Sequence, residues 1–404
     1  LQAMVPAVKS VSLVVAWFGN DLRAGECQVR PGVEVPAKET TPVSWSVNGV
    51  ARADAHIVSR DVQDRPVYGG TPADFAVVEA IREMKARGLR VTFYPFILMD
   101  VPPGNTLPNP YSDNASEVGQ PAFPWRGRIT CSPAAGHVGS IDQTAAAGAQ
   151  VAAMFGDAAP GDFALLGDTV SWTGSAGDWG LRRMVLHYAH LCAAAGGVDA
   201  LLIGSEMPGL TTIRNGAANF PAVDAYRQLA ADVRSIVGAG TKVSYAADWS
   251  EYFGHQPSDG SGDVYFHLDP LWADPNIDFI GIDNYVPLSD WRDDFEHADA
   301  NSAPAIYDRA YLQANIAGGE GFDTLDLSSF TQAVTFDAAG LTFADASGQT
   351  SEVSGFEAIV GTDHDDVITG AGSAGLELHG GAGDDVLTGG SGNDLILGEA
   401  GDDA

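Results

Sequence analysis

Val198-Asp-Ala-Leu-Leu-Ile-Gly-Ser-Glu-Met-Pro-Gly-Leu210 is the stretch that most constrains the architecture of this chain. Five of its first six residues are apolar, a run too short for a buried helix and typical of a strand covered on both faces. Gly204 and Ser205 then predict a turn that leaves Glu206 at the strand's carboxyl end. α/β barrels keep their chemistry at this position. The alternative is a carboxylate that caps a helix or forms a loop salt bridge.

Strand and helix patterns alternate on both sides of this stretch. Further buried strands are predicted at residues 10–18, 89–99, 242–247 and 277–282, and helices at residues 72–88, 142–155, 179–195, 222–237 and 304–316. In the first helix, Thr71 is expected to cap the N-terminus, with Pro72 in the first helical position. Helices that connect buried strands predict βαβ units around a parallel sheet. Residues 101–140 form a long loop, which is usually functional or an insertion.

Acids and aromatic residues recur where the predicted strands end. The set comprises Trp17, Tyr94, Asp100, Glu206, Asp248, Trp249, Asp283 and Tyr285. Aromatic rings offer platforms to the apolar faces of sugars, and carboxyl groups carry the proton transfers of glycoside cleavage. As a set these residues favour a carbohydrate cleft in which Trp17, Tyr94, Trp249 and Tyr285 contact the substrate. The alternative is that the rings fill the core and the acids cap helices.

The charge distribution separates the two ends of the chain. The 404 residues carry 53 acids and 21 bases, a net charge of −32, which argues against nucleic acid or an anionic membrane as a partner. Residues 318–404 hold 17 of the acids and none of the Lys or Arg residues. Such a segment repels itself unless cations neutralise it, so calcium is an expected cofactor.

Other sequence signals are weak. Cys27, Cys131 and Cys192 are too few and too scattered for a disulfide framework or a zinc site. No run reaches transmembrane length, and no signal peptide opens the chain. Because the chain begins with Leu1 and ends within a repeat, we treat it as a fragment at both ends.

Six ordered blocks across residues 10–317 resemble a known family. They are Phe18-Gly-Asn-Asp21, Tyr68-Gly-Gly-Thr-Pro72, Phe93-Tyr-Pro-Phe-Ile-Leu-Met-Asp100, Gly204-Ser-Glu-Met207, Ala246-Ala-Asp-Trp-Ser-Glu-Tyr252 and Gly281-Ile-Asp-Asn-Tyr-Val-Pro-Leu288. The resemblance is to the TIM-barrel-like domain of gene transfer agent and phage tail baseplate proteins, itself similar to clan A glycoside hydrolases. It implies that Glu206 is the acid/base residue and that Asp248, Trp249, Asp283 and Tyr285 line the cleft.

One feature of those enzymes is missing from this sequence. The second catalytic glutamate, expected at the end of a seventh strand, is not found, and no barrel pattern follows residue 317. Asp248 or Asp283 would have to pair with Glu206 at the spacing of an inverting enzyme. The expected domain is therefore a truncated, degenerate (β/α)8 barrel, and whether it is an enzyme stays open.

The C-terminal segment carries a nonapeptide of the form G-G-x-G-x-D-x-U-x. Copies begin at Gly380, Gly389 and Gly398, with looser copies at residues 361–369 and 318–326. They resemble RTX (haemolysin-type) calcium-binding repeats, which form a parallel β-roll. The glycines would adopt positive φ, the sixth residue would supply a carboxylate, and residues eighteen apart would stack. The expected metal residues are Asp366, Gly381, Gly383, Asp385, Gly390, Gly392, Asp394 and Asp403.

These observations predict an α/β protein with a barrel-like domain at residues 1–317, a β-rich connection at 318–360 and an all-β roll at 361–404. The expected function is that of a secreted calcium-binding protein whose barrel recognises glycan or peptidoglycan. One alternative is a structural tail protein of a gene transfer agent or phage-like particle, with other tail proteins as partners. Another is an active glycoside hydrolase that uses Glu206.

Overall fold

The computed structural model describes residues 5–114, 116, 118–252, 254–285, 308–318, 324–328, 332–337, 342–345, 350–352, 358–370 and 376–404. Two compact units divide the chain, Leu1–Asn284 and Tyr285–Ala404. Parts of the predicted helix at 304–316 and of the predicted repeat at 318–326 lie outside the described residues. The three domain boundaries predicted from the sequence therefore stay predictions. No helix in the described residues is long and apolar enough to cross a bilayer.

A six-stranded sheet organises the first unit, in the order β12-β11-β10-β7-β1-β2. Its strands are β1 (Ser10–Gly19), β2 (Val29–Arg30), β7 (Arg90–Met99), β10 (Ala200–Ser205), β11 (Lys242–Asp248) and β12 (Gly281–Asp283). Five of them run parallel in chain order, and only β2 is antiparallel to its neighbour. Small two-stranded sheets pair β3 (Gly32–Val33) with β6 (His56–Ile57), β4 (Ser46–Val47) with β5 (Val50–Ala51), and β8 (Phe163–Leu166) with β9 (Thr169–Trp172).

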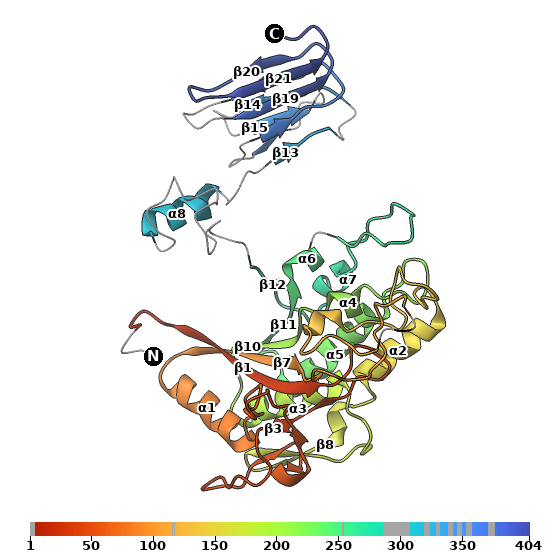
Figure 1. Ribbon diagram of the computed structural model, residues 1–404. Helices are drawn as coiled ribbons and strands as arrows, with labels where there is room; N and C mark the ends of the chain where they lie inside the picture. The colour runs from red at the N-terminus through yellow and green to blue at the C-terminus, as the bar shows by residue number, and fades with distance from the viewer. Residues whose placement is uncertain are drawn as a thin grey trace. The chain divides into compact units, whose positions relative to one another are not determined.

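Helices connect the parallel strands and pack against one face of the sheet (Figure 1). They are α1 (Asp74–Ala86), α2 (Ala145–Phe155), α3 (Leu181–Ala194), α5 (Pro221–Val237) and the single turns α4 (Pro208–Thr211), α6 (Trp249–Tyr252) and α7 (Asp269–Trp272), with 3-10 turns η1 (Arg52–Asp54), η2 (Arg126–Arg128) and η3 (Pro160–Asp162). Helix α3 contacts both α1 and α5, so the helices follow the order of the strands. Sequential parallel strands covered by helices in the same order are the arrangement found in the wall of a TIM barrel.

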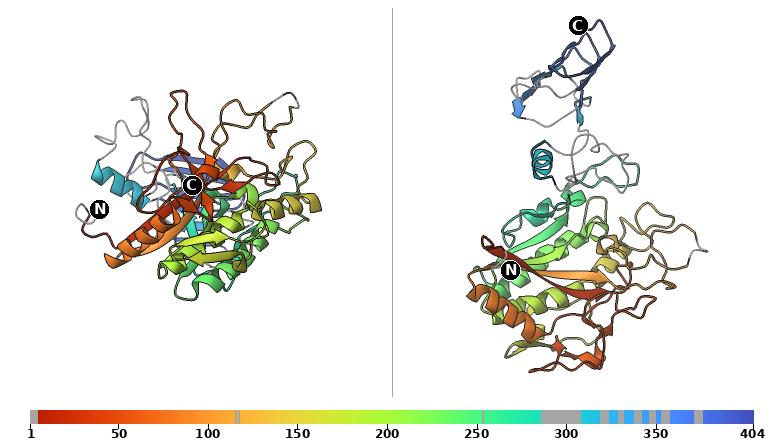
Figure 2. Two further views of the ribbon diagram at one scale, coloured as in Figure 1. Left: turned by 90° about the horizontal axis from the view of Figure 1, so that it is seen from below. Right: turned by 60° about the vertical axis from the view of Figure 1, so that its left-hand side comes forward.

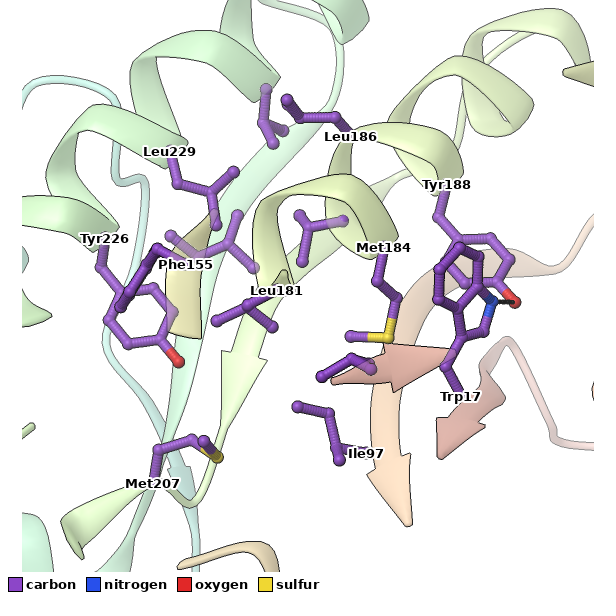
Figure 3. Packing of buried hydrophobic residues seen from close by; sticks show 14 of the residues in the cluster. Trp17, Ile97, Phe155, Leu181, Met184, Leu186, Tyr188, Met207, Tyr226 and Leu229 are labelled. Atoms are coloured by element: carbon purple, nitrogen blue, oxygen red, sulfur yellow. Dashed lines mark hydrogen bonds between the residues drawn. The ribbon is translucent and has the colours of Figure 1, made fainter. Parts of the chain in front are cut away.

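The core of the first unit lies between this helical layer and the sheet. Trp17 of β1 is fully buried there, and its Nε1 donates a hydrogen bond of 2.9 Å to Tyr188 Oη of α3 (Figure 3). Tyr226 of α5 and Phe155 of α2 meet edge to face, with ring centroids 4.9 Å apart. Alternation along β7 sends Val91, Phe93, Ile97 and Met99 into this core. The opposite face of β7 is therefore the one available for a site.

The sheet is strongly curved but does not close. Tyr94 on β7 donates a hydrogen bond to Asp283 on β12, although β10 and β11 lie between them. Adjacent strands are about 4.8 Å apart, so on a flat sheet these side chains would stand too far apart to meet. Within the described residues, β12 and β2 remain edges and no strand joins them, so the predicted (β/α)8 barrel is corrected to an open, barrel-like sheet.

Local structure differs from the sequence prediction at two turns. Gly204 and Ser205 do not turn but continue β10, and the chain turns at Glu206. Gly204 is required instead by packing, because a Cβ there would lie 2.7 Å from Tyr226 Oη. Thr71 does not cap α1, since its hydroxyl donates to Ala16 O at 2.7 Å and accepts from Gly32 N at 3.0 Å. The hydroxyl thus ties β1 and β3 to the chain before the helix.

The described residues of the second unit form helix α8 (Arg309–Gly318), drawn in cyan in Figure 1, and two sheets of short strands, drawn in blue in Figures 1 and 2. One sheet has the order β13-β17-β19-β21 and the other β16-β15-β14-β18-β20. The strands are β13 (Thr324–Asp326), β14 (Val334–Asp337), β15 (Thr342–Asp345), β16 (Thr350–Glu352), β17 (Ala358–Val360), β18 (Val367–Thr369), β19 (Glu377–Ala382), β20 (Val386–Thr388) and β21 (Leu395–Ala400). From β17 onward the chain alternates between the sheets, as in a roll.

The register of these strands matches the predicted eighteen-residue stacking between β19 and β21 and departs from it by one residue between β18 and β20. Glu377 pairs with Leu395, eighteen residues on, and Val367 pairs with Val386, nineteen residues on. Ile368 and Leu387, at the apolar eighth position, are buried in a small core with Leu378, whereas Ile396 on the last strand is 44% exposed. The pairs among β17 to β21 are parallel, as predicted for the roll, whereas β15 and β16 run antiparallel within the predicted connection at 318–360. As a whole, the second unit therefore fits a parallel β-roll only loosely.

Candidate functional site

The backbone around Glu206 is shaped to aim its side chain. The register between β10 and β11 shifts between Leu202 and Ser205, which marks a bulge in β10. Glu206 then has φ of 48°, the left-handed region that non-glycine residues avoid. Such a conformation costs about 1–3 kcal/mol and persists only where the surroundings hold it. A bulge followed by a strained residue is typical of a strand end that positions a functional side chain.

Two residues from the long loop hold the Glu206 carboxylate. Trp125 Nε1 and Arg126 Nη2 each donate a hydrogen bond of 2.8 Å to Glu206 Oε2. The Arg126–Glu206 ion pair is buried, and the guanidinium lies 3.6 Å from the centre of the Phe96 ring. A buried, charge-assisted pair of this kind has a fixed geometry. Of the two alternatives for the loop at 101–140, a functional segment or an insertion, these two side chains favour the first.

The same arginine links Glu206 to Asp283. Arg126 Nη2 donates to Ser205 Oγ at 2.8 Å, and Ser205 Oγ donates to Asp283 Oδ2 at 3.2 Å. Tyr94 Oη also donates to Asp283, and burial followed by this bond raises the pKa of Tyr94. The structure therefore brings together three residues predicted from the sequence, namely Glu206, Asp283 and Tyr94.

This network is poorly suited to glycoside cleavage. The contacts through Ser205 and Arg126 place Glu206 Oε2 and Asp283 Oδ2 no more than about 9 Å apart, which admits the spacing of an inverting enzyme. However, the space between them holds a guanidinium and a hydroxyl, where an inverting enzyme needs a water and a sugar. The two carboxylates are therefore better placed to bind these groups than to act on a glycosidic bond between them.

Asp248, the other candidate carboxylate, accepts hydrogen bonds from the short helix α6. Its Oδ2 accepts hydrogen bonds from the backbone N and the hydroxyl of Ser250, in the first turn of α6. Glu251, in the same turn, is a buried carboxyl that sequence reasoning missed. It accepts from Thr211 Oγ1 at 2.7 Å, from Tyr245 Oη at 3.1 Å and from Asp248 N at 2.8 Å. Burial raises its pKa to about 7.

The predicted aromatic contacts are divided among different environments. Trp17 is fully buried between sheet and helices, where it offers no surface to a sugar. Trp249 is 49% exposed beside Asp248, and Trp125 is 42% exposed above Glu206. Tyr285 is exposed at the start of the second unit. Substrate contact by Tyr94, Trp249 and Tyr285 stays a prediction.

In the second unit, stacked aspartates form a ladder along one edge. Asp385 Oδ1 accepts from Asp366 N at 2.7 Å, and Asp403 Oδ1 accepts from Asp385 N at 3.1 Å. Asp394, on the following nonapeptide, accepts in the same way from Leu376 N at 2.9 Å. The predicted stacking of Asp385 on Asp403 is confirmed. Each carboxylate thus uses one oxygen for the neighbouring turn and has a second oxygen for another partner.

The second oxygen of Asp385 is buried and has no hydrogen-bond partner among the described residues. Burial, with repulsion from Asp366, Asp403 and Asp365, raises the pKa of Asp385. A buried acceptor without a partner is costly, and a cation would remove that cost while neutralising its acidic neighbours. Asp385 therefore has the environment expected of a ligand for a hard cation such as Ca²⁺.

Glycines leave room for oxygen atoms beside these carboxylates. A Cβ on Gly380 would lie 2.3 Å from Asp385 Oδ2 and 2.7 Å from Gly398 O. A Cβ on Gly361 would likewise meet Gly380 O and an oxygen of Asp366. Carboxylate and carbonyl oxygens that share one small space fit calcium, which prefers such ligands. No three His, Cys, Asp or Glu side chains converge in the described residues, so backbone carbonyls would supply most of the ligands.

The predicted backbone of the repeats is only partly observed. Gly381 and Gly383 have φ of 105° and 129°, as expected for the turn of a calcium-binding nonapeptide. For Gly390 and Gly392 the positive φ stays a prediction.

Comparison with known families supports both halves of the sequence interpretation. Residues 179–335 match the GTA TIM-barrel-like domain, and residues 377–404 match the RTX calcium-binding nonapeptide repeat. The C-terminal residues are thus RTX repeats, whose cofactor is Ca²⁺. The first match begins just before α3 and leaves β1 and β7 outside it. No curated protein sequence matches the chain.

Two solved structures of GH113 β-1,4-mannanase, one described as a complex, also resemble this chain. Each is 15% identical and covers 72% of the chain, with TM-scores of 0.32 and 0.33. The chain spans 55% and 56% of those two proteins. Scores this low do not by themselves establish a shared fold, and the activity of the mannanases belongs to those proteins.

Proposed function

We propose that this chain is a secreted calcium-binding protein in which Ca²⁺ completes the RTX repeats and the barrel-like unit recognises carbohydrate without cleaving it. The observation that carries the proposal is the buried Asp385 carboxylate, which has an unpartnered oxygen beside the carbonyl of Gly398. RTX repeats are typical of secreted proteins. Calcium held by carbonyls and few carboxylates would bind at the weaker end of the protein range, near 10⁻⁵–10⁻³ M, which suits an extracellular site.

Carbohydrate recognition rests on the first unit. Exposed Trp125 and Trp249 flank the carboxyl ends of β10 and β11, where barrel-like proteins bind ligands. The fixed Arg126–Glu206 pair supports binding over hydrolysis, because its guanidinium occupies the space that a scissile bond would need. Glycan or peptidoglycan strands are the substrates that this arrangement suits.

Calorimetric titration of Ca²⁺ into the whole chain, with circular dichroism before and after, tests the calcium half of the proposal. We expect saturable binding accompanied by a gain or stabilisation of β structure. Asp385→Asn should weaken binding at least about tenfold, because it removes the charged ligand. Asp363→Asn, the same change at an exposed residue of the same unit, should leave binding unchanged. No binding at millimolar Ca²⁺ would refute the proposal.

A structural role in a phage-like tail is the second candidate, and the match of residues 179–335 to the GTA TIM-barrel-like domain favours it. Under this reading the barrel-like unit contacts other tail proteins. Co-purification of the chain with assembled particles, and no retention of the chain on a glycan array, would favour this role. Retention on glycans in the absence of particles would favour carbohydrate recognition.

The third reading, an active glycoside hydrolase, makes a separate prediction. If Glu206 were the acid/base residue, Glu206→Gln would abolish the release of reducing sugar from polysaccharide. On our proposal the native chain releases none. Any release that Glu206→Gln abolishes would therefore overturn the non-catalytic reading.

A further inference from the structure

A pocket of about 430 Å³ lies in the first unit, apart from the network around Glu206. Its walls come from the segments that directly follow β10 and β11 and from the loop at 101–140. This volume falls within the range of small-molecule sites, roughly 300–1,000 Å³. Strand ends are where barrel-like folds bind ligands, and nothing described above assigns a role to this pocket.

Close backbone packing fixes the shape of the pocket. Gly209 is the second residue of the short helix α4, and a Cβ there would lie 2.7 Å from both Gly127 O and Ile129 O. Only glycine therefore lets the segment 127–129 rest directly on α4. Tyr111 adds a second tie, since its hydroxyl donates to Arg128 O at 2.8 Å. A pocket built on such contacts exists before a ligand enters it.

Arg128 gives the pocket its positive charge. The guanidinium lies over the Tyr111 ring, 4.7 Å from its centre, and lines the cavity. Within the described chain, no acid forms an ion pair with Arg128, although the protein carries 53 acids and only 21 bases. An arginine left without an acid in so acidic a chain, at the wall of a pocket, points to an anionic ligand. Its planar fork matches the two oxygens of a carboxylate.

The other polar walls are uncharged hydrogen-bonding groups. Burial lowers the pKa of His255, and lowers that of His267 to about 4, so both rings are neutral at pH 7. His267 Nδ1 is buried, and no described residue gives it a hydrogen bond. Neutral imidazoles, together with the lining residues Ser250 and Gln256, suit hydroxyl groups, which both donate and accept.

We propose that this pocket binds a sugar that bears a carboxylate, with Arg128 pairing with the carboxylate and the neutral rings of His255 and His267 facing the hydroxyls. The proposal rests on carbohydrate recognition by the first unit and narrows it to acidic sugars. The Tyr111 ring offers an apolar surface of the kind on which sugar rings stack.

A carboxylate fits the pocket better than a phosphate does. Arg128 and Glu251 are the charged residues among those that line the pocket, so a single positive charge is available to a ligand. A phosphate dianion would leave one charge unpaired in a protein of net charge −32. Glu251 opposes the anion only weakly at neutral pH, since burial raises its pKa to about 7 and leaves much of it uncharged.

Saturation-transfer NMR on the whole chain, with Ca²⁺ present, tests this proposal with three matched probes. They are D-glucuronate, its neutral amide glucuronamide, and D-glucose. We expect glucuronate to bind at least about tenfold more tightly than the other two, in line with the strength of a hydrogen-bonded charge pair. Arg128→Gln should remove this preference, and Arg128→Lys should retain part of it. Arg90→Gln, at the opposite end of the sheet, is the matched control and should change nothing.

Each result separates this proposal from the broader one. Equal binding of the three probes, unaffected by Arg128→Gln, would overturn the acidic-sugar site and leave carbohydrate recognition standing. Binding of none of them, or of any oligosaccharide in a glycan array, would overturn both. If Arg128→Gln fails to fold, the preference of the native chain for glucuronate over glucuronamide, and its partial retention in Arg128→Lys, still decide the question.

Discussion

Replacing Glu251 with Gln should remove a pH-dependent cost to the stability of the first unit. Burial raises the pKa of Glu251 from 4.5 to about 7, so the folded state binds this proton more tightly than the unfolded chain does. The free energy of unfolding contributed by Glu251 is therefore greatest below pH 4.5 and falls as the pH rises towards 7. A shift of this size changes the free energy of unfolding by about 3 kcal/mol over the whole titration. Roughly 2 kcal/mol of this change occurs between pH 5 and pH 8.

The glutamine side chain can take the place of the protonated acid. Its amide oxygen would accept from Asp248 N, which now donates to Glu251 Oε2 at 2.8 Å, and its NH2 group would donate to the hydroxyl of Thr211 or Tyr245. We therefore expect the free energy of unfolding of Glu251→Gln, relative to that of the native chain, to rise by about 2 kcal/mol as the pH is raised from 5 to 8.

Urea unfolding followed by tryptophan fluorescence measures this difference, since seven of the eight tryptophans precede residue 285. Work above pH 5 avoids the sequence pI of about 4.3, where solubility is lowest. The exposed Glu79→Gln in α1 serves as a control and should show no comparable change between pH 5 and pH 8. The reasoning would be refuted if the difference in free energy of unfolding between Glu251→Gln and the native chain stayed constant from pH 5 to pH 8 or decreased.

Three further predictions concern packing and backbone. Trp17→Phe should destabilise the first unit by about 1–3 kcal/mol in urea, because Tyr188 Oη loses a buried donor. Leu378→Ala should lower the stability of the second unit by about 2–5 kcal/mol, measured by thermal circular dichroism, because its side chain is fully buried. Gly381→Ala should weaken calcium binding in calorimetry, since Gly381 has φ of 105° and a Cβ would lie 2.1 Å from Thr362 O.

Much of the secondary structure could be predicted from the sequence, because apolar runs and helical periodicity report burial directly. The runs at residues 10–18, 89–99 and 242–247 are strands β1, β7 and β11 of one parallel sheet. The predicted strand at 277–282 is shorter, since β12 begins only at Gly281. The failure at Thr71 has a tertiary cause, as its hydroxyl bonds Ala16 O and Gly32 N, residues far from it in sequence.

The acidic residues of the candidate site could be predicted from the sequence, but the residues that form hydrogen bonds with them could not. Glu206 follows the fully buried strand β10, and Asp283 ends the more exposed β12, so both acids lie at strand ends that an apolar run in the sequence indicates. Arg126 and Trp125, which hold Glu206, lie in a loop about eighty residues earlier and carry no periodic or spacing signal. Trp17 was predicted to contact substrate but lies in the core. Successive side chains on a strand point to opposite faces, so a ring near the strand's carboxyl end can point either to the core or to the cleft.

The two units should differ in how much Ca²⁺ stabilises them. In the first, an apolar core stands between helices and sheet, and its charged groups are largely paired, as Arg126 is with Glu206. In the second, residues 318–404 carry 17 acids and no Lys or Arg, and the described core holds few side chains. Within the described residues, one oxygen of the buried Asp385 carboxylate has no hydrogen-bond partner, and an added cation would supply one. Stability should rise with Ca²⁺ in the second unit and be insensitive to it in the first.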